Sequence, residues 1–136
     1  MKRYALLLLG VSMLVASVNI QCIAQDFKPY AGSKLDDKAS HGASNAAPGK
    51  ESVVYTTGDA FDQVYAFYKG QYKEYKMPQG PKLASGQQIK WAFFILDGGK
   101  DLLTSKYWMK IQRPYVGGTD GKDIRDATVI QTVRSK

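Results

Sequence analysis

Hydrophobic residues recur with the period of an α-helix in one segment of this 136-residue chain. Between residues 56 and 71, four of them fall at positions i, i+3, i+4 and i+7, namely Phe61, Val64, Tyr65 and Tyr68. Residues at that spacing share one face of a helix. The apolar face is wide, so the pattern predicts an amphipathic helix that lies broadly on a sheet.

Four other segments are rich in β-branched and aromatic residues, as strands are. These segments are 52–56, 89–97, 107–116 and 125–135. Segment 89–97 is apolar on both faces, which is typical of a central strand covered from both sides. Residues 25–35 are predicted to be extended, with a bend.

The remaining segments carry turn residues and no apolar period. Residues 36–50 are small and polar, and we expect a flexible loop there. The chain thus reads strand, strand, helix, strand, strand, strand, in the order β-β-α-β-β-β. Short links between strands favour antiparallel pairing. We predict an α+β fold, with a mostly antiparallel sheet of about four to five strands and one amphipathic helix packed on one face.

The N-terminus has the three parts of a secretory signal peptide. Two basic residues come first, an apolar run follows at 5–18, and Cys22 and Ala24 supply small side chains at −3 and −1. Cleavage would fall between Ala24 and Gln25. We therefore predict a signal peptide at 1–24 and a single domain at 25–136 that is periplasmic or secreted.

Two other readings of this segment stay open. Cys22 could carry a lipid anchor, although Asn19 and Gln21 occupy the lipobox positions that prefer aliphatic and small residues. An uncleaved signal could also anchor the chain, although the apolar run is shorter than the roughly 18 to 20 residues that span a bilayer. Cleavage after Ala24 would leave a mature chain without cysteine and without a transmembrane helix.

The mature chain would carry a modest positive charge. It has 17 Lys and Arg and 12 Asp and Glu, because only Lys2 and Arg3 of the 19 basic residues are removed, which gives +5. This excess favours an anionic component of the cell envelope as a partner, or a solvated surface with no partner. Export argues against nucleic acid.

The residue types used in most catalytic and metal sites are scarce. His41 is the single histidine and lies in the expected loop, so the sequence indicates no catalytic residue and no cofactor. Four loop aspartates could form a cation site if their loops met at one end of the sheet, namely Asp97, Asp101, Asp120 and Asp123. Their spacing does not match a calcium-binding loop, and turn formation through hydrogen bonds to their own backbone is the favoured explanation for them.

A basic and aromatic patch is the other candidate site. It would combine residues that follow the helix with two on the polar face of a strand, namely Tyr72, Lys73, Tyr75, Trp108 and Lys110. Such side chains bind sugars or anionic headgroups by stacking and charge. Tyr72 could instead extend the helix stripe into the core.

Two short motifs resemble a pattern of uncharacterised small secreted bacterial α+β domains. They are PYAGSK at 29–34 and VYAFYK at 64–69. In that pattern a first strand with a Tyr-x-Gly-Ser-Lys motif precedes a helix ending in Phe-Tyr, and three strands follow. Ala31 stands where the pattern often has proline. The resemblance implies this strand order and export, and it implies no activity.

From these features we expect a small exported bacterial protein that acts as a non-catalytic binding or interaction module in the cell envelope. One alternative is a carboxylate-based or cation-dependent hydrolase that uses the loop aspartates. The other is a periplasmic inhibitor or adaptor of a protein partner.

Overall fold

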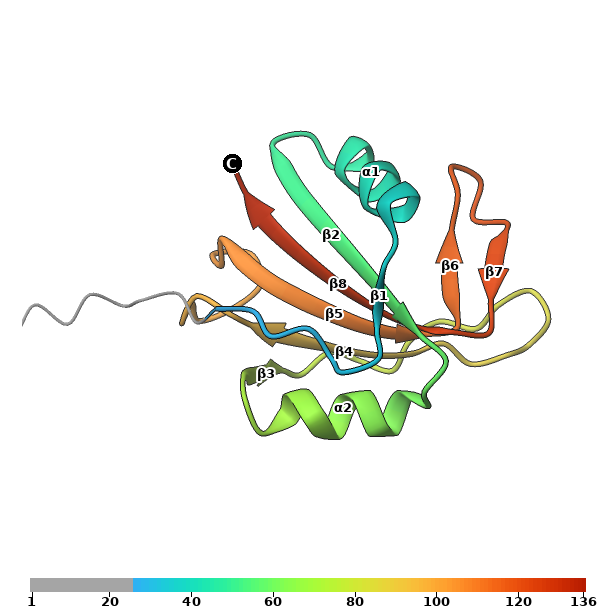
Figure 1. Ribbon diagram of the computed structural model, residues 1–136, viewed down its shortest axis with the longest axis horizontal. Helices are drawn as coiled ribbons and strands as arrows, with labels where there is room; N and C mark the ends of the chain where they lie inside the picture. Colours follow the sequence, from blue (N-terminus) through green and yellow to red (C-terminus); the bar gives the residue numbers. More distant parts are fainter. Residues whose placement is uncertain (1–25) are drawn as a thin grey trace, which may run out of the picture.

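Six antiparallel strands form the main sheet, in the order β1-β2-β8-β5-β4-β3 (Figure 1). The computed structural model describes residues 26–136. A separate two-stranded hairpin, β6–β7, interrupts the chain between β5 and β8. The strands are β1 (Lys34–Leu35), β2 (Lys50–Thr57), β3 (Lys73–Tyr75), β4 (Lys90–Ile95), β5 (Tyr107–Arg113), β6 (Tyr115–Gly117), β7 (Asp123–Arg125) and β8 (Thr128–Ser135).

Helix α2 (Phe61–Lys69) covers one face of this sheet, as its apolar spacing predicted. Val64 and Tyr68 are fully buried on the side of α2 that faces the strands. They pack into one cluster with side chains from three strands, Phe94, Met109, Ile111 and Ile130. Burying one large apolar side chain stabilises a fold by about 1.5–3 kcal/mol. This cluster is therefore the main core of the domain.

The α+β class and the antiparallel sheet agree with the sequence prediction, whereas the numbers of strands and helices differ. Four of the five predicted strands correspond to β2, β4, β5 and β8, and the first, predicted as extended over 25–35, is a strand only at β1. The main sheet has six strands because β1 and β3 pair at its two edges over only two and three residues. Strand β3 was not predicted, because a segment of three residues shows no clear alternation of apolar and polar residues.

The predicted flexible loop at 36–50 is wrong, because most of it forms helix α1 (Asp37–Ala46). The side-chain carboxylate of Asp36 accepts a hydrogen bond from the Ala39 N–H at 2.9 Å and caps the first turn. Four small residues at i, i+3, i+4 and i+7 form one face of α1, namely Ala39, Gly42, Ala43 and Ala46. A face made of alanine and glycine has the helical period but little hydrophobicity, so a search for large apolar residues does not detect it.

Two serines on α1 fix this helix to the outer edge of β2. The Ser40 hydroxyl accepts from the Val54 N–H at 2.8 Å, and the Ser44 hydroxyl accepts from the Ser52 N–H at 2.9 Å. Strand β1 pairs with β2 only near Tyr55, so these N–H groups would otherwise lack a partner on that edge. The helix thereby closes an exposed sheet edge, which natural proteins protect from pairing with other chains.

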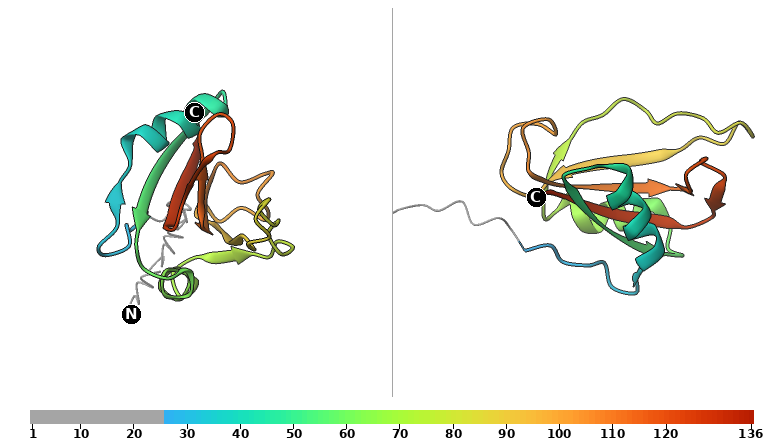
Figure 2. Two further views of the ribbon diagram at one scale, coloured as in Figure 1. Left: turned by 90° about the vertical axis from the view of Figure 1, so that its right-hand side faces the viewer. Right: turned by 90° about the horizontal axis from the view of Figure 1, so that it is seen from above.

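The two helices lie on opposite sides of the sheet, with α1 above and α2 below the strands in Figure 1 and in the left view of Figure 2. Between residues 26 and 136, no helix is long and apolar enough to cross a membrane. The predicted cleavage site at Ala24 and Gln25, and Cys22 with it, lies outside the described residues.

Candidate functional site

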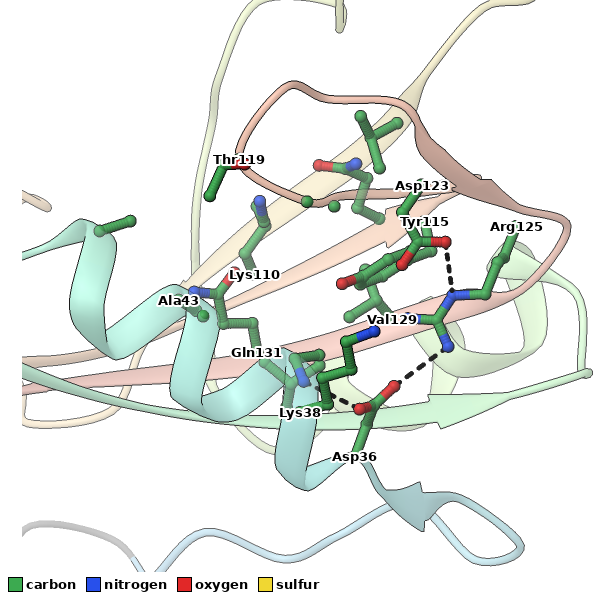
Figure 3. Close-up of a pocket in the computed structure, with 18 residues that line it drawn as sticks. Asp36, Lys38, Ala43, Lys110, Tyr115, Thr119, Asp123, Arg125, Val129 and Gln131 are labelled. Atoms are coloured by element: carbon green, nitrogen blue, oxygen red, sulfur yellow. Dashed lines mark hydrogen bonds and ion pairs between the residues drawn. The ribbon is translucent and has the colours of Figure 1, made fainter.

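A cavity of about 820 Å³ lies between α1, the face of the sheet opposite α2, and the β6–β7 hairpin (Figure 3). The small residues of α1 that line it, among them Ala39, Gly42 and Ala43, leave space above the strands. Large side chains on this face of α1 would fill that space. Pockets that hold small molecules have volumes of roughly 300–1,000 Å³, so the cavity is large enough for a ligand.

The wall beside α1 is apolar. Val54 of β2 and Val129 of β8 are buried and pack with Tyr115 into a second, smaller core cluster. Ala39 and Ala43 of α1 pack against this cluster from above. An apolar ligand group placed here would leave water and contact these side chains, a favourable change of about 25 cal/mol per Å² of buried apolar surface.

Lys110 extends from β5 into the cavity (Figure 3). It is partly buried, and its strand neighbours are Phe93 of β4 and Gln131 of β8. Burial lowers the pKa of its ammonium below the ordinary value of 10.5, and no opposite charge offsets this effect. Among residues 26–136, none supplies a carboxylate that pairs with Lys110. The ammonium is therefore the one cavity group whose charge is both desolvated and unpaired.

Arg125 of β7, by contrast, is fully engaged at the mouth of the cavity (Figure 3). Its Nη1 donates to Asp36 at 3.1 Å, its Nε lies 3.4 Å from an Asp123 oxygen, and its guanidinium lies 3.9 Å above the Tyr115 ring. The hydrogen bond from the Ala39 N–H, followed by that from Arg125, lowers the pKa of Asp36 despite partial burial. The cluster holds the start of α1 to the hairpin.

Two glutamine side chains complete the polar lining, and both are held by hydrogen bonds. The Gln112 amide donates to the Pro114 carbonyl at 3.2 Å. The Gln131 amide donates to the Ser52 hydroxyl at 3.4 Å. Because each amide is fixed by a protein partner, the polar groups around Lys110 have defined positions before any ligand arrives.

Four of the five residues of the predicted basic and aromatic patch lie on one face of the sheet, because Lys73 and Tyr75 of β3 are in register, across β4, with Trp108 and Lys110 of β5. Tyr72 is buried in the α2 core, where its hydroxyl accepts from the Lys28 N–H at 3.1 Å and lies 3.2 Å from the Asp26 carbonyl. Lys73 and Tyr75 lie on β3, at the edge of the sheet. The other two predicted residues, Trp108 and Lys110, lie on β5, and of the five only Lys110 lines the cavity.

The four aspartates proposed for a cation site occupy opposite ends of the sheet, because β5 runs the length of the sheet between their loops (Figure 1). Asp97 and Asp101 lie in the β4–β5 loop, whereas Asp120 and Asp123 lie in the β6–β7 hairpin. The part of the chain that the structure describes has no group of three or more metal-binding side chains. The hydrolase alternative therefore lacks the shared aspartate site on which it was based.

Asp97 instead organises its own loop. Its carboxylate accepts hydrogen bonds from the Ser105 hydroxyl at 2.7 Å and from the N–H groups of Gly99, Lys106 and Tyr107 at 3.0, 2.6 and 3.2 Å. Burial alone would raise the pKa of Asp97, but these hydrogen bonds outweigh it and lower the pKa. This is the turn-forming role that the sequence also allowed.

The sequence analysis singled out Lys110 and, as part of a cation site, Asp123, and it missed the rest of the cavity lining. Gln131 lies between Val129 and Val133 on one face of β8, and a polar residue between two valines at strand spacing was the available signal. The role of Arg125 had no local signal, because its partner Asp36 lies 89 residues away in the chain. Comparisons with protein-family models, with curated proteins and with solved structures found no match.

Proposed function

We propose that this chain is an exported, non-catalytic binding protein that holds a small molecule in the cavity between α1 and the sheet. The observation that carries the proposal is a cavity of about 820 Å³ with an apolar wall and a few fixed polar groups. Small-molecule sites have this composition, because apolar contact supplies affinity and the polar groups orient the ligand.

The pairing of the cavity's acidic groups favours binding over catalysis. Asp36 and Asp123 are the carboxylates that line the cavity, and both pair with Arg125. A general base needs a carboxylate that is available to take a proton from the substrate. Here Asp36 also caps α1, so its charge stabilises the helix that covers the ligand.

The exported location in this proposal rests on the signal-peptide pattern at 1–24. A periplasmic or secreted protein meets small molecules that enter or leave the cell, as well as anionic components of the envelope. The site that we propose for such contacts is the cavity, with Lys110 as the one residue that it shares with the predicted patch.

Filling the cavity tests this function without assuming the charge of the ligand. Ala43→Phe places a large ring on the cavity side of α1, and Ala66→Phe places the same ring on the exposed side of α2. The neutral fluorescent probe N-phenyl-1-naphthylamine should bind the wild type saturably. We expect Ala43→Phe to weaken that binding at least tenfold and Ala66→Phe to leave it unchanged.

Circular dichroism and thermal unfolding would establish that both variants are folded before binding is compared. If Ala43→Phe binds the probe as well as the wild type does, the cavity is not the binding site. If the wild type binds neither this probe nor any of the small amphiphiles described below, the proposed function is wrong.

A further inference from the structure

We propose that the ligand of this cavity is a small carboxylic acid with an apolar body, whose carboxylate pairs with Lys110 while its body lies against Val54, Val129 and the alanine face of α1. This inference rests on the proposed binding function and adds the chemical class of the ligand. It follows from the balance of charge in the cavity, from the cost of keeping Lys110 there, and from the shape of the apolar wall.

Among the described residues, the charge balance leaves one cation inside the cavity without a carboxylate partner. The lining contains three cationic residues, Lys38, Lys110 and Arg125, and two carboxylates, Asp36 and Asp123. Both carboxylates pair with Arg125, and Lys38 is exposed at the start of α1. The unpaired ammonium of Lys110 therefore favours an anionic ligand group over a cationic one in the interior of the cavity.

Lys110 costs stability in the empty protein. A partly buried ammonium without a carboxylate loses hydration and gains no ion pair in return. An uncharged side chain of similar length would fill the same place between Phe93 and Gln131 at a lower cost. A carboxylate at Nζ would offset the lost hydration and would raise the lowered pKa of Lys110 again, since an opposite charge favours the ammonium.

The surroundings of Lys110 suit one carboxylate better than a phosphate. Phosphate sites usually provide several cations or a series of free backbone N–H groups. Here Arg125, at the mouth of the cavity, already pairs with two carboxylates, and the amides of Gln112 and Gln131 donate to protein oxygens. The apolar wall lies on the neighbouring strands β8 and β2, so a ligand can contact it while its acid group reaches Lys110.

Three ten-carbon probes that differ only in their head group test the class of ligand. Decanoate, decanol and decylamine would be titrated separately into the purified protein by isothermal calorimetry, below the concentrations at which they form micelles. We expect decanoate to bind at least tenfold more tightly than decanol, and decylamine to bind most weakly. Lys110→Met should remove the preference for decanoate and keep the binding of decanol. The control Lys106→Met, at an exposed lysine just before β5, should keep the wild-type preference.

The outcomes separate this inference from the proposed function. Equal binding of decanoate and decanol by the wild type would refute the carboxylate class while leaving the cavity as a binding site. A preference for decanoate that survives Lys110→Met would overturn the role of Lys110. If the wild type binds none of the three probes and also does not bind the neutral naphthylamine probe, the proposed binding function itself is wrong.

Discussion

Replacing Lys110 by methionine should make the ligand-free protein more stable, which is unusual for a change at a partly buried residue. Methionine keeps an unbranched stem of similar length between Phe93 and Gln131, so the packing of the β5 side chain is retained. The change removes only the ammonium, which is desolvated and has no carboxylate partner among the described residues. Most point substitutions destabilise a protein by 0.5–3 kcal/mol, so the expected sign is itself informative.

The size of the expected gain in stability follows from the position of the Lys110 ammonium. Replacing buried charged groups with apolar residues of similar volume has stabilised proteins by about 1–4 kcal/mol. Lys110 is only partly buried and its head reaches the cavity, where water can enter, so the lower end of that range applies. We expect a gain of about 1 kcal/mol, which for a domain of roughly 100 residues raises the melting temperature by about 4 °C.

Urea unfolding of both proteins between pH 7 and pH 10.5 would measure this gain and its pH dependence. Burial lowers the pKa of Lys110 in the folded state below the ordinary 10.5, so between these values the unfolded chain binds more protons. Wild-type stability therefore rises with pH across this window, relative to the variant that lacks the group. The gap between the two proteins should be largest near pH 7 and should narrow toward pH 10.5.

The matched control is Lys106→Met, which removes an exposed ammonium and should change the free energy of unfolding by less than about 0.5 kcal/mol. If Lys110→Met instead lowers stability by 1 kcal/mol or more at pH 7, Lys110 has a stabilising partner and the reasoning is wrong. A gap that does not change with pH would equally show that desolvation of the ammonium is not the cause.

Three further predictions concern the fold that supports the cavity. Met109→Ala should cost about 3 kcal/mol in urea unfolding, because Met109 is fully buried in the α2 core and the change leaves a void; a loss under 1 kcal/mol would contradict that packing. Asp97→Asn should cost about 1 kcal/mol at pH 7, since a neutral amide accepts the hydrogen bonds of its loop less strongly. The folded-state pKa of Asp97 is lowered below 3.8, so this cost should persist above pH 4 and shrink as the pH falls through that pKa. A cost that does not change between pH 2 and pH 5 would show that the charge of Asp97 does not stabilise the loop. Asp36→Ala should cost about 1 kcal/mol and speed hydrogen exchange in helix 37–46, because the helix loses its cap and Arg125 loses a partner; unchanged exchange there would show that the cap is dispensable.

The proposed function gives a physical reason for a helix with no buried residues. Helix α1 is held by its serines at the edge of β2 and by the Asp36–Arg125 pair at its start. Few large side chains tie it to the sheet, so the space beneath it stays open. The small face of α1 thus provides the volume that a ligand would occupy.

The sequence by itself determined the elements that have a strong local period. Helix α2 was predicted because large apolar residues lie on one face over two turns, and β2, β4, β5 and β8 because their β-branched and aromatic residues continue over five residues or more. Lys110 was also singled out, because it falls on the polar face of its strand. These features depend on neighbours within a few residues, which the sequence displays directly.

Only the tertiary structure decided the rest, because it depends on partners far apart in the chain. The short strands β1 and β3 exist through pairing at the sheet edges, and helix α1 is fixed by hydrogen bonds to β2 and by a partner in β7. The cavity forms where α1, three strands and the β6–β7 hairpin meet. Among residues 26–136, the lack of a carboxylate partner for Lys110 is likewise a property of this packing, because the fold places the cavity carboxylates Asp36 and Asp123 beside Arg125.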